Sequence, residues 1–161
     1  MDEENREIVV LGMVSRSISK FGKISQEAKI EPKELELILQ KLEKSRLIRV
    51  DAKKGWLSTK IDIKPTEEGY REFERQLKIL QEKWDQLENT YKSGDKQELE
   101  QKLKEDKSLL PSMMMFGIID MMMFSMMFSM IGTSMGNFIP AEDMENSDFG
   151  DDGEFDIDIG F

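Results

Sequence analysis

The sequence predicts a mainly α-helical protein with a small β-hairpin, followed by a long C-terminal helix, a methionine-rich hydrophobic helix and a disordered acidic tail. Three observations lead to this fold class. Apolar residues recur every three or four positions over much of the first 111 residues, which is the period of an α-helix. Residues 56–63 instead alternate with period two, as a half-buried strand does. Beyond residue 111 the composition changes to a run of methionine and then to acidic residues.

The N-terminal region begins with three predicted helices. The first covers residues 4–21 and is expected to end at Gly22, a residue type typical of the position after a helix. Ser25 is expected to cap a brief second helix over residues 26–29. The third helix covers residues 32–45; it begins at a proline, which suits the first turn, and its apolar residues form one face.

A hairpin and another helix follow. Residues 47–50 form the first predicted strand, residues 53–55 the turn, and residues 56–63 the second strand. Pro65 stops the second strand, and Thr66 with the two glutamates after it begins a helix. The predicted order is therefore helix, short helix, helix, hairpin, helix.

Two segments of this region have the sequences ISQEAKIEPKELELILQKLEKSRLIRVD and KKGWLSTKIDIKPTEEGYREFE. Together they resemble the winged helix-turn-helix of small archaeal and bacterial regulators, such as the MarR-like and PadR-like families. The matching parts are KLEKSRLI, where the third helix runs into a strand, and PTEEGY, where the last helix begins. The resemblance covers about residues 5–75 and implies a winged helix-turn-helix domain over residues 1–68. It implies a third helix in the major groove of duplex DNA and a hairpin that touches phosphates or the minor groove; winged helices also serve as protein-binding domains.

By this resemblance, lysine and glutamine side chains on the third helix and the hairpin would contact DNA. The expected nucleic-acid-binding residues are Lys33, Gln40, Lys41, Lys44, Lys53, Lys54 and Lys60, with Arg49 at the base of the hairpin. The set departs from a strong DNA reader, because Glu34 and Glu36 would lie close to phosphates and no arginine is placed for the bidentate contact to guanine. Arg46 also stands where glycine is usual at the end of this helix. Residues 1–65 carry 14 basic and 11 acidic side chains, so tight binding by one copy is not expected, although a dimer with basic hairpins could still bind.

From residue 70 apolar residues follow alternating steps of three and four, the a/d seam of a heptad repeat. We expect this helix, residues 69–92, to pair with its counterpart in a second subunit and form a homodimer; the alternative is packing on its own domain or on the segment after Gly94. The predicted dimerisation residues are Tyr70, Phe73, Leu77, Leu80, Trp84, Leu87 and Tyr91. Residues 93–111 are predicted to be a charged helical spacer that Pro111 ends.

Residues 113–135 hold ten of the 13 methionines and predict a hydrophobic helix within residues 112–137. Three interpretations stay open: a transmembrane span, an adhesive surface for membranes or hydrophobic helices, and a self-association or buried core helix. Asp120 opposes the span, because insertion of a mid-helix aspartate costs about 2.5–3.5 kcal/mol. The composition resembles the methionine-rich helices of the signal-recognition-particle protein and of co-chaperones, whose pliable side chains accept many apolar shapes. The expected contacts to a membrane or hydrophobic partner are Met114, Phe116, Met122, Phe124, Met126 and Phe128.

The predicted disordered tail, residues 138–161, is acidic. Residues 1–111 balance 23 basic against 23 acidic side chains, so the net charge of −10 arises entirely from the acids that follow. The last eight residues, EFDIDIGF, alternate acidic or glycine positions with apolar ones. That pattern suits a docking peptide that adds a strand to a partner or a segment that covers a basic surface; the simplest interpretation is a solubilising tail.

No enzymatic function is expected. The chain has no cysteine and no histidine, which removes thiolate chemistry, the usual general base and the commonest metal ligand, and no motif indicates a cofactor. The sequence therefore predicts a dimeric, DNA-binding transcription regulator of the cytoplasm, attached to a membrane or a hydrophobic partner through its methionine-rich segment. The alternative is a protein-interaction adaptor or holdase-like factor that binds apolar segments through that helix.

Overall fold

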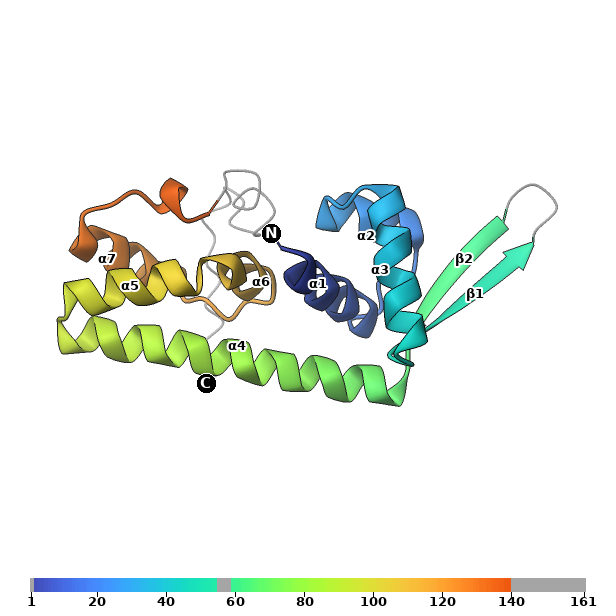
Figure 1. The fold of residues 1–161 in the computed structure, drawn as a ribbon, viewed down its shortest axis with the longest axis horizontal. Helices are drawn as coiled ribbons and strands as arrows, with labels where there is room; N and C mark the ends of the chain where they lie inside the picture. Colours follow the sequence, from blue (N-terminus) through green and yellow to red (C-terminus); the bar gives the residue numbers. More distant parts are fainter. Residues whose placement is uncertain (1, 55–58, 140–161) are drawn as a thin grey trace, which may run out of the picture.

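The computed structural model describes residues 2–54 and 59–139 and is mainly helical, with one antiparallel hairpin (Figure 1). The elements, in chain order, are α1 (Glu3–Ser15), α2 (Phe21–Ala28), α3 (Pro32–Lys44), β1 (Ile48–Lys54), β2 (Thr59–Pro65), α4 (Glu67–Ser93), α5 (Lys96–Glu105), α6 (Leu110–Met115) and α7 (Met121–Ile131), with short 3-10 turns before α6 and after α7. This order confirms the predicted succession of three helices, a hairpin and a further helix.

The first helix is shorter than predicted. It ends at Ser15 because Ser17 adopts a left-handed conformation (φ 72°) and the amide of Ile18 donates to the carbonyl of Met13 at 3.0 Å. This pattern is a helix C-terminal motif that usually uses glycine. Gly22, predicted to follow the first helix, lies instead within α2, which begins at Phe21 rather than residue 26.

The β-sheet includes a short third stretch beside the two strands of the hairpin. The backbone amide of Ile63 donates to the carbonyl of Ser19 at 2.9 Å, and Lys20 pairs with Asp62 as an isolated antiparallel bridge. β2 therefore lies between β1 and a short extended stretch of the α1–α2 connection. The predicted turn was wrong in part, since Lys53 and Lys54 belong to β1, and the predicted residues 55–58 lie outside the described residues.

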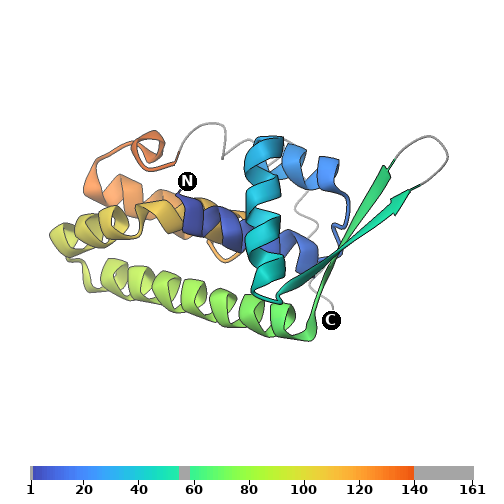
Figure 2. The same ribbon diagram turned by 45° about the vertical axis from the view of Figure 1, so that its right-hand side comes forward.

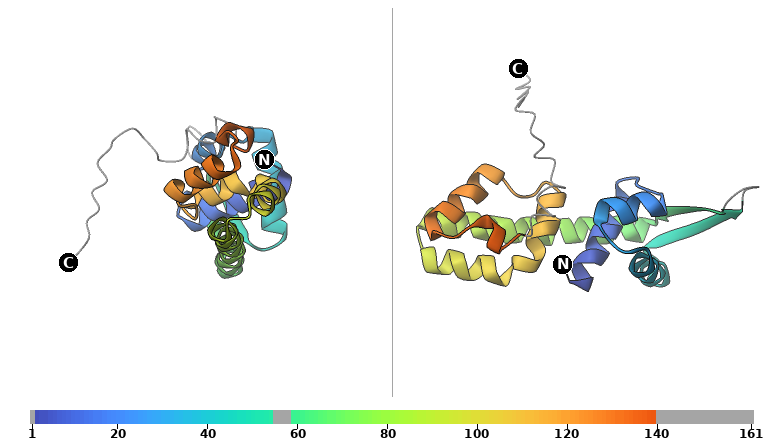
Figure 3. Two further views of the ribbon diagram at one scale, coloured as in Figure 1. Left: turned by 90° about the vertical axis from the view of Figure 1, so that its left-hand side faces the viewer. Right: turned by 90° about the horizontal axis from the view of Figure 1, so that it is seen from above.

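α4 is the element along which everything else is arranged (Figures 1 and 2). Its 27 residues begin beside the hairpin, where Thr66 caps the helix by accepting a hydrogen bond from the Gly69 amide at 3.0 Å. α1 packs on α4 near this end. α5 to α7 cover the other end, so that the two groups of helices follow one another along α4 (Figure 3, right).

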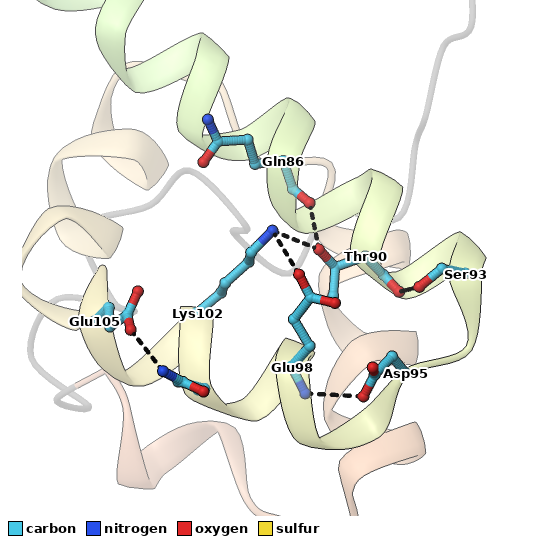
Figure 4. Close-up of polar contacts among 8 residues, drawn as sticks. Gln86, Thr90, Ser93, Asp95, Glu98, Lys102 and Glu105 are labelled. Carbon is cyan, nitrogen blue, oxygen red and sulfur yellow. Dashed lines mark hydrogen bonds and ion pairs between the residues drawn. The ribbon is translucent and has the colours of Figure 1, made fainter.

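The α4–α5 turn holds the second group of helices in place (Figure 4). Gly94 takes the left-handed conformation (φ 80°) after α4, and Asp95 caps α5 by accepting from the Glu98 amide at 3.0 Å. Lys102 on α5 donates to the hydroxyl of the buried Thr90 on α4 at 3.0 Å. Since glycine suits the left-handed turn and aspartate the cap, α5 folds back antiparallel against α4, as a hairpin return of this charged segment would.

One hydrophobic core runs through both groups of helices. The rings of Phe73 on α4 and Phe116 after α6 pack edge-on, with their centroids 5.1 Å apart. Those of Trp84 and Phe124 pack in the same way, with centroids 6.0 Å apart. On α5, Leu99 and Leu103 are fully buried, while the other residues of this helix are exposed or partly exposed. The N-terminal and C-terminal halves therefore do not have separate cores.

The predicted dimerisation seam lies inside this core. Its central residues, Leu80, Trp84 and Leu87, are at most 2% exposed, and Phe73 is 6% exposed. The helices after Gly94 cover the stripe, so the alternative of packing within the chain is correct, and a second subunit has no access to this seam. Tyr70, which begins the seam, is 46% exposed, and Leu77 and Tyr91 are partly buried.

The methionine-rich segment is two helices rather than one. α6 and α7 are separated at Gly117, which is left-handed (φ 71°), and Asp120 caps α7 by accepting from the Met123 amide at 3.2 Å. Pro111, predicted to end a helix, lies in the first turn of α6, where its missing amide is not needed. Within residues 2–54 and 59–139, no helix combines the length and the apolar character needed to cross a bilayer.

Burial also corrects the predicted hydrophobic-partner residues. Four of the six are at most 7% exposed and belong to the core; they are Met114, Phe116, Phe124 and Phe128. Met122 and Met126, one turn apart on α7, are 71% and 45% exposed. At the other end of the segment, Phe138 and Ile139 are buried, so these two residues are part of the core and not of the predicted tail, whose remaining residues 140–161 lie outside the described residues.

Candidate nucleic-acid interface

The outward face of α3 is formed by residues spaced three or four apart. Helical periodicity places them opposite the apolar face, whose members, Leu35, Ile38, Leu39 and Leu42, are at most 4% exposed. The exposed stripe consists of Lys33, Leu37, Gln40 and Lys44. Leu37 is 66% exposed, an unusual value for a leucine of a folded helix. The structure therefore brings three of the predicted DNA-contacting residues of α3 onto one face, together with an apolar side chain.

Lys41 is not on that stripe. It lies on the flank of α3 that faces α1, where its ammonium donates to Glu7 and, at 3.4 Å, to Glu3. The hydrogen bond that Lys41 donates to Glu7 is the main cause that raises the pKa of Lys41 above its ordinary value. A cation that already has two carboxylate partners gains less from a phosphate, so Lys41 is the weakest of the predicted α3 contacts.

The acidic residues of α3 are partly neutralised. Glu34, on the same flank as Lys41, forms an ion pair with Arg6 of α1. On the opposite flank, the carboxylate of Glu43 accepts a hydrogen bond from the backbone amide of Val50 in β1 at 3.0 Å. Glu36 is exposed. The predicted repulsion between Glu34 and phosphates is thus reduced by a partner that only the tertiary structure supplies.

In the backbone register of the hairpin, basic residues lie opposite one another at both ends, at positions that share one face. Residues directly opposite one another in an antiparallel ladder share a face, and period two places three consecutive pairs together. The pairs on this face are Arg49 with Lys64, Asp51 with Asp62, and Lys53 with Lys60. The backbone of three predicted residues, Lys53, Lys54 and Lys60, belongs to the end of the hairpin that is remote from α4.

Of the acidic pair between these basic pairs, the carboxylate of Asp62 is stabilised by neighbouring groups. A hydrogen bond from Ser19 is the main cause that lowers the pKa of the Asp62 carboxyl below 3.8, and Lys20 and Lys64 add to the shift. The two ammonium groups lie 3.5 and 3.7 Å from the Asp62 oxygens. Asp62 is therefore an ionised carboxylate whose charge is compensated by Lys20 and Lys64.

Two arginines contribute to the surface between α3 and the hairpin, and sequence reasoning gave them too little weight. Arg46 and Arg49 are exposed, and neither has an ion-pair partner among the described residues. Arg46 is left-handed (φ 62°), which explains why a glycine is usual there. Period two, counted back from Lys53, could have placed Arg49 on the basic face of the hairpin.

Comparison of the chain with protein-family models, with curated proteins and with solved structures found no match. Within the described part of the chain, no three acidic side chains are grouped so that they could hold a metal ion. The electrostatics and shape of the α3 and hairpin surface are therefore the guide to function.

Proposed function

We propose that the chain is a winged helix-turn-helix protein that binds duplex DNA and regulates transcription. The observation that carries the proposal is the connectivity: α2, a tight turn and α3 lead into β1 and β2, and residues 19–20 complete the sheet along β2. In winged helices this arrangement presents the second helix of the motif to the major groove and the hairpin to the backbone or minor groove.

The exposed stripe of α3 supports a role in reading DNA. Gln40 can form the bidentate contact to adenine, and Leu37 can pack on the methyl group of thymine. Lys33 and Lys44, near the two ends of the helix, suit phosphates on either side of the groove. These residues favour an A·T-containing site, with positioning supplied by the lysines.

Affinity of a single copy is expected to be modest, because residues 1–65 have only three more basic than acidic side chains, and affinity grows with the number of phosphates neutralised. Two copies on adjacent half-sites would double that number. We therefore keep a homodimer as part of the proposal, formed through a surface other than the buried seam of α4.

The test is binding of the full chain to a mixed-sequence duplex and to an A·T-rich duplex at low salt, followed by fluorescence anisotropy. We expect a steep loss of affinity as salt is raised, and a loss of about tenfold or more in Lys33→Glu with Lys44→Glu. The matched control is Lys78→Glu with Lys92→Glu, which makes the same change in net charge on exposed positions of α4. Absence of binding by the natural chain at low salt, or an equal loss in both double variants, would refute the proposal.

A second candidate function, binding of an apolar helix, is favoured by the exposure of Met122 and Met126. These side chains lie four residues apart, with the exposed Ser125 beside them, and form a small pliable surface. An adaptor or holdase-like function would use this surface. Anisotropy of a labelled apolar helical peptide tests it: binding that survives Met122→Lys with Met126→Lys excludes this surface as the site.

A further inference from the structure

The outer edge of β1 has backbone groups that are not used by the hairpin. In the pair Val50 and Ile63, the Ile63 amide donates to Ser19 and the Val50 amide donates to Glu43, so both amides point away from the partner strand. This is the non-hydrogen-bonded type of pair, and the period of two makes Ala52 the next residue whose amide points outward from β1. Among the described residues, no strand pairs with this edge.

A depression of about 280 Å³ lies beside this edge. It is lined by Glu43, Arg46, Ile48, Arg49, Val50, Asp51 and Thr66. The carboxylate of Glu43 already binds an amide there, so the edge accommodates an acidic group close to the backbone. Arg46 and Arg49 add two guanidinium groups without acidic partners among the described residues. An extended peptide that combines carboxylates with apolar side chains has the chemistry that this edge requires.

We propose that the occupant is the chain's own C-terminal segment, residues 154–161, added as a strand to the edge of β1. Its sequence EFDIDIGF carries carboxylates at residues 154, 156 and 158 and apolar side chains at 155, 157 and 159. In a strand these two sets lie on opposite faces. The acidic set then runs beside the hairpin face that carries Arg49, and the apolar set beside Ile48 and Val50. The outward amide of Ala52 and the outward carbonyls of β1 supply the hydrogen bonds, since the Val50 amide is already bound to Glu43.

The chain between the core and this segment is long enough for docking within one molecule. The fourteen residues 140–153 follow the buried Ile139 and can span up to about 50 Å. α4, which extends from the hairpin to the α5–α7 end of the body, is about 40 Å long for its 27 residues. The linker can therefore cover a distance equal to the whole length of α4, which is enough to reach β1, and at short linker length docking in the same chain is favoured over capture of another copy.

Docking would place three carboxylates next to the basic face of the hairpin and weaken its attraction for any polyanion. This inference does not rest on the proposed DNA binding, since it concerns only the segment and the strand edge. Failure of the docking proposal can be recognised independently of the DNA-binding proposal, because the exchange experiment uses no nucleic acid.

The experiment is amide hydrogen exchange of the full chain, read by NMR at Ala52. We expect exchange at Ala52 to be about tenfold or more slower in the natural chain than in the triple variant Phe155→Ser, Ile157→Ser, Ile159→Ser. The amide of Leu80, in the core of α4, should exchange equally slowly in both and shows that the fold is intact. Equal exchange at Ala52 in the two chains overturns the proposal.

Charge reversal tests the same contact from the other side. Arg46→Glu with Arg49→Glu should release Ala52 as the tail variant does, whereas Arg71→Glu with Lys78→Glu, two exposed positions of α4, should leave its protection unchanged. Protection that rises with protein concentration would show that the strand comes from a second copy and would overturn docking within one chain.

Discussion

Phe116 packs directly on the backbone of Gly12. A methyl group added at Gly12 would lie 2.5 Å from Cε1 of Phe116 and 2.7 Å from Cε2 of Phe73. The guanidinium of Arg16, one turn further along α1, lies 5.0 Å from the centre of the Phe116 ring and 5.8 Å from that of Phe73. This contact joins the first helix to the methionine-rich segment and makes one folding unit of regions whose compositions differ sharply.

Gly12→Ala should destabilise the protein by about 1–3 kcal/mol, because two buried aromatic rings must move to admit the new methyl group. The measurement is urea unfolding followed by circular dichroism. Gly22→Ala is the matched control: nothing lies within 4 Å of a methyl group there, and alanine in a helix gains about 0.5–1 kcal/mol. Similar stabilities of the two variants would contradict the packing described.

Arg46→Gly should stabilise the protein by about 0.5–1 kcal/mol. The residue is left-handed at the end of α3, a conformation that costs a side-chain-bearing residue about 1–2 kcal/mol and glycine almost nothing, although glycine also has more entropy to lose on folding. Urea unfolding of Arg46→Gly beside Arg46→Gln separates backbone strain from loss of charge, because glutamine removes the charge and keeps the strain. A gain in the glutamine variant equal to that in the glycine variant would show that strain is not the cause.

Asp120→Ala should lower the free energy of unfolding by about 1 kcal/mol, because it removes the cap of α7. Asp120→Asn retains an acceptor for the Met123 amide and should lose little. Near-ultraviolet circular dichroism would report the variant locally, since Trp84 packs edge-on against Phe124 of α7. Equal losses in the two variants would argue that charge, and not capping, is what matters at this position.

Asp62 should make the hairpin sensitive to acid. Its pKa is lowered in the folded chain, so its contribution to stability is present above about pH 4 and disappears as the pH falls through the lowered pKa. Asp62→Asn is therefore expected to lower the urea midpoint at pH 7, and this loss should shrink as the pH is lowered below about 4. Asp51→Asn, directly opposite, relieves a like-charge pair and should raise the midpoint at pH 7. A loss from Asp62→Asn that does not shrink as the pH falls would indicate packing rather than charge.

Elements with local signals were the predictable part of the fold. Pro32 at the start of α3, the period-two alternation that ends at Pro65, and Thr66 before α4 each determine a boundary through the backbone of a few neighbouring residues. α1 was too long in the prediction because Ser17, and not a glycine, takes the left-handed position. The break between α6 and α7 had its signals in Gly117 and Asp120, but the surrounding methionines dominated the interpretation.

The candidate site was predictable where helical periodicity decides exposure. Lys33, Gln40 and Lys44 lie on the outward face of α3 for that reason alone. The ion pair between Lys41 and Glu7 joins two helices that are far apart in the sequence, so no local sequence pattern predicts it. The heptad stripe of α4 was recognised correctly as apolar, but a stripe does not tell whether it is covered by another chain or by its own later residues.

The contact between Arg16 and Phe116 also has a consequence for biosynthesis. Their positions differ by 100 residues. At the 5–20 residues per second of typical translation, about 5–20 s pass before a nascent α1 can meet the ring that covers it. During that interval α1 can already pack on α3, β2 and α4, but the part of it around Gly12 lacks the ring that covers it, and packing there is completed only after Phe116 has emerged.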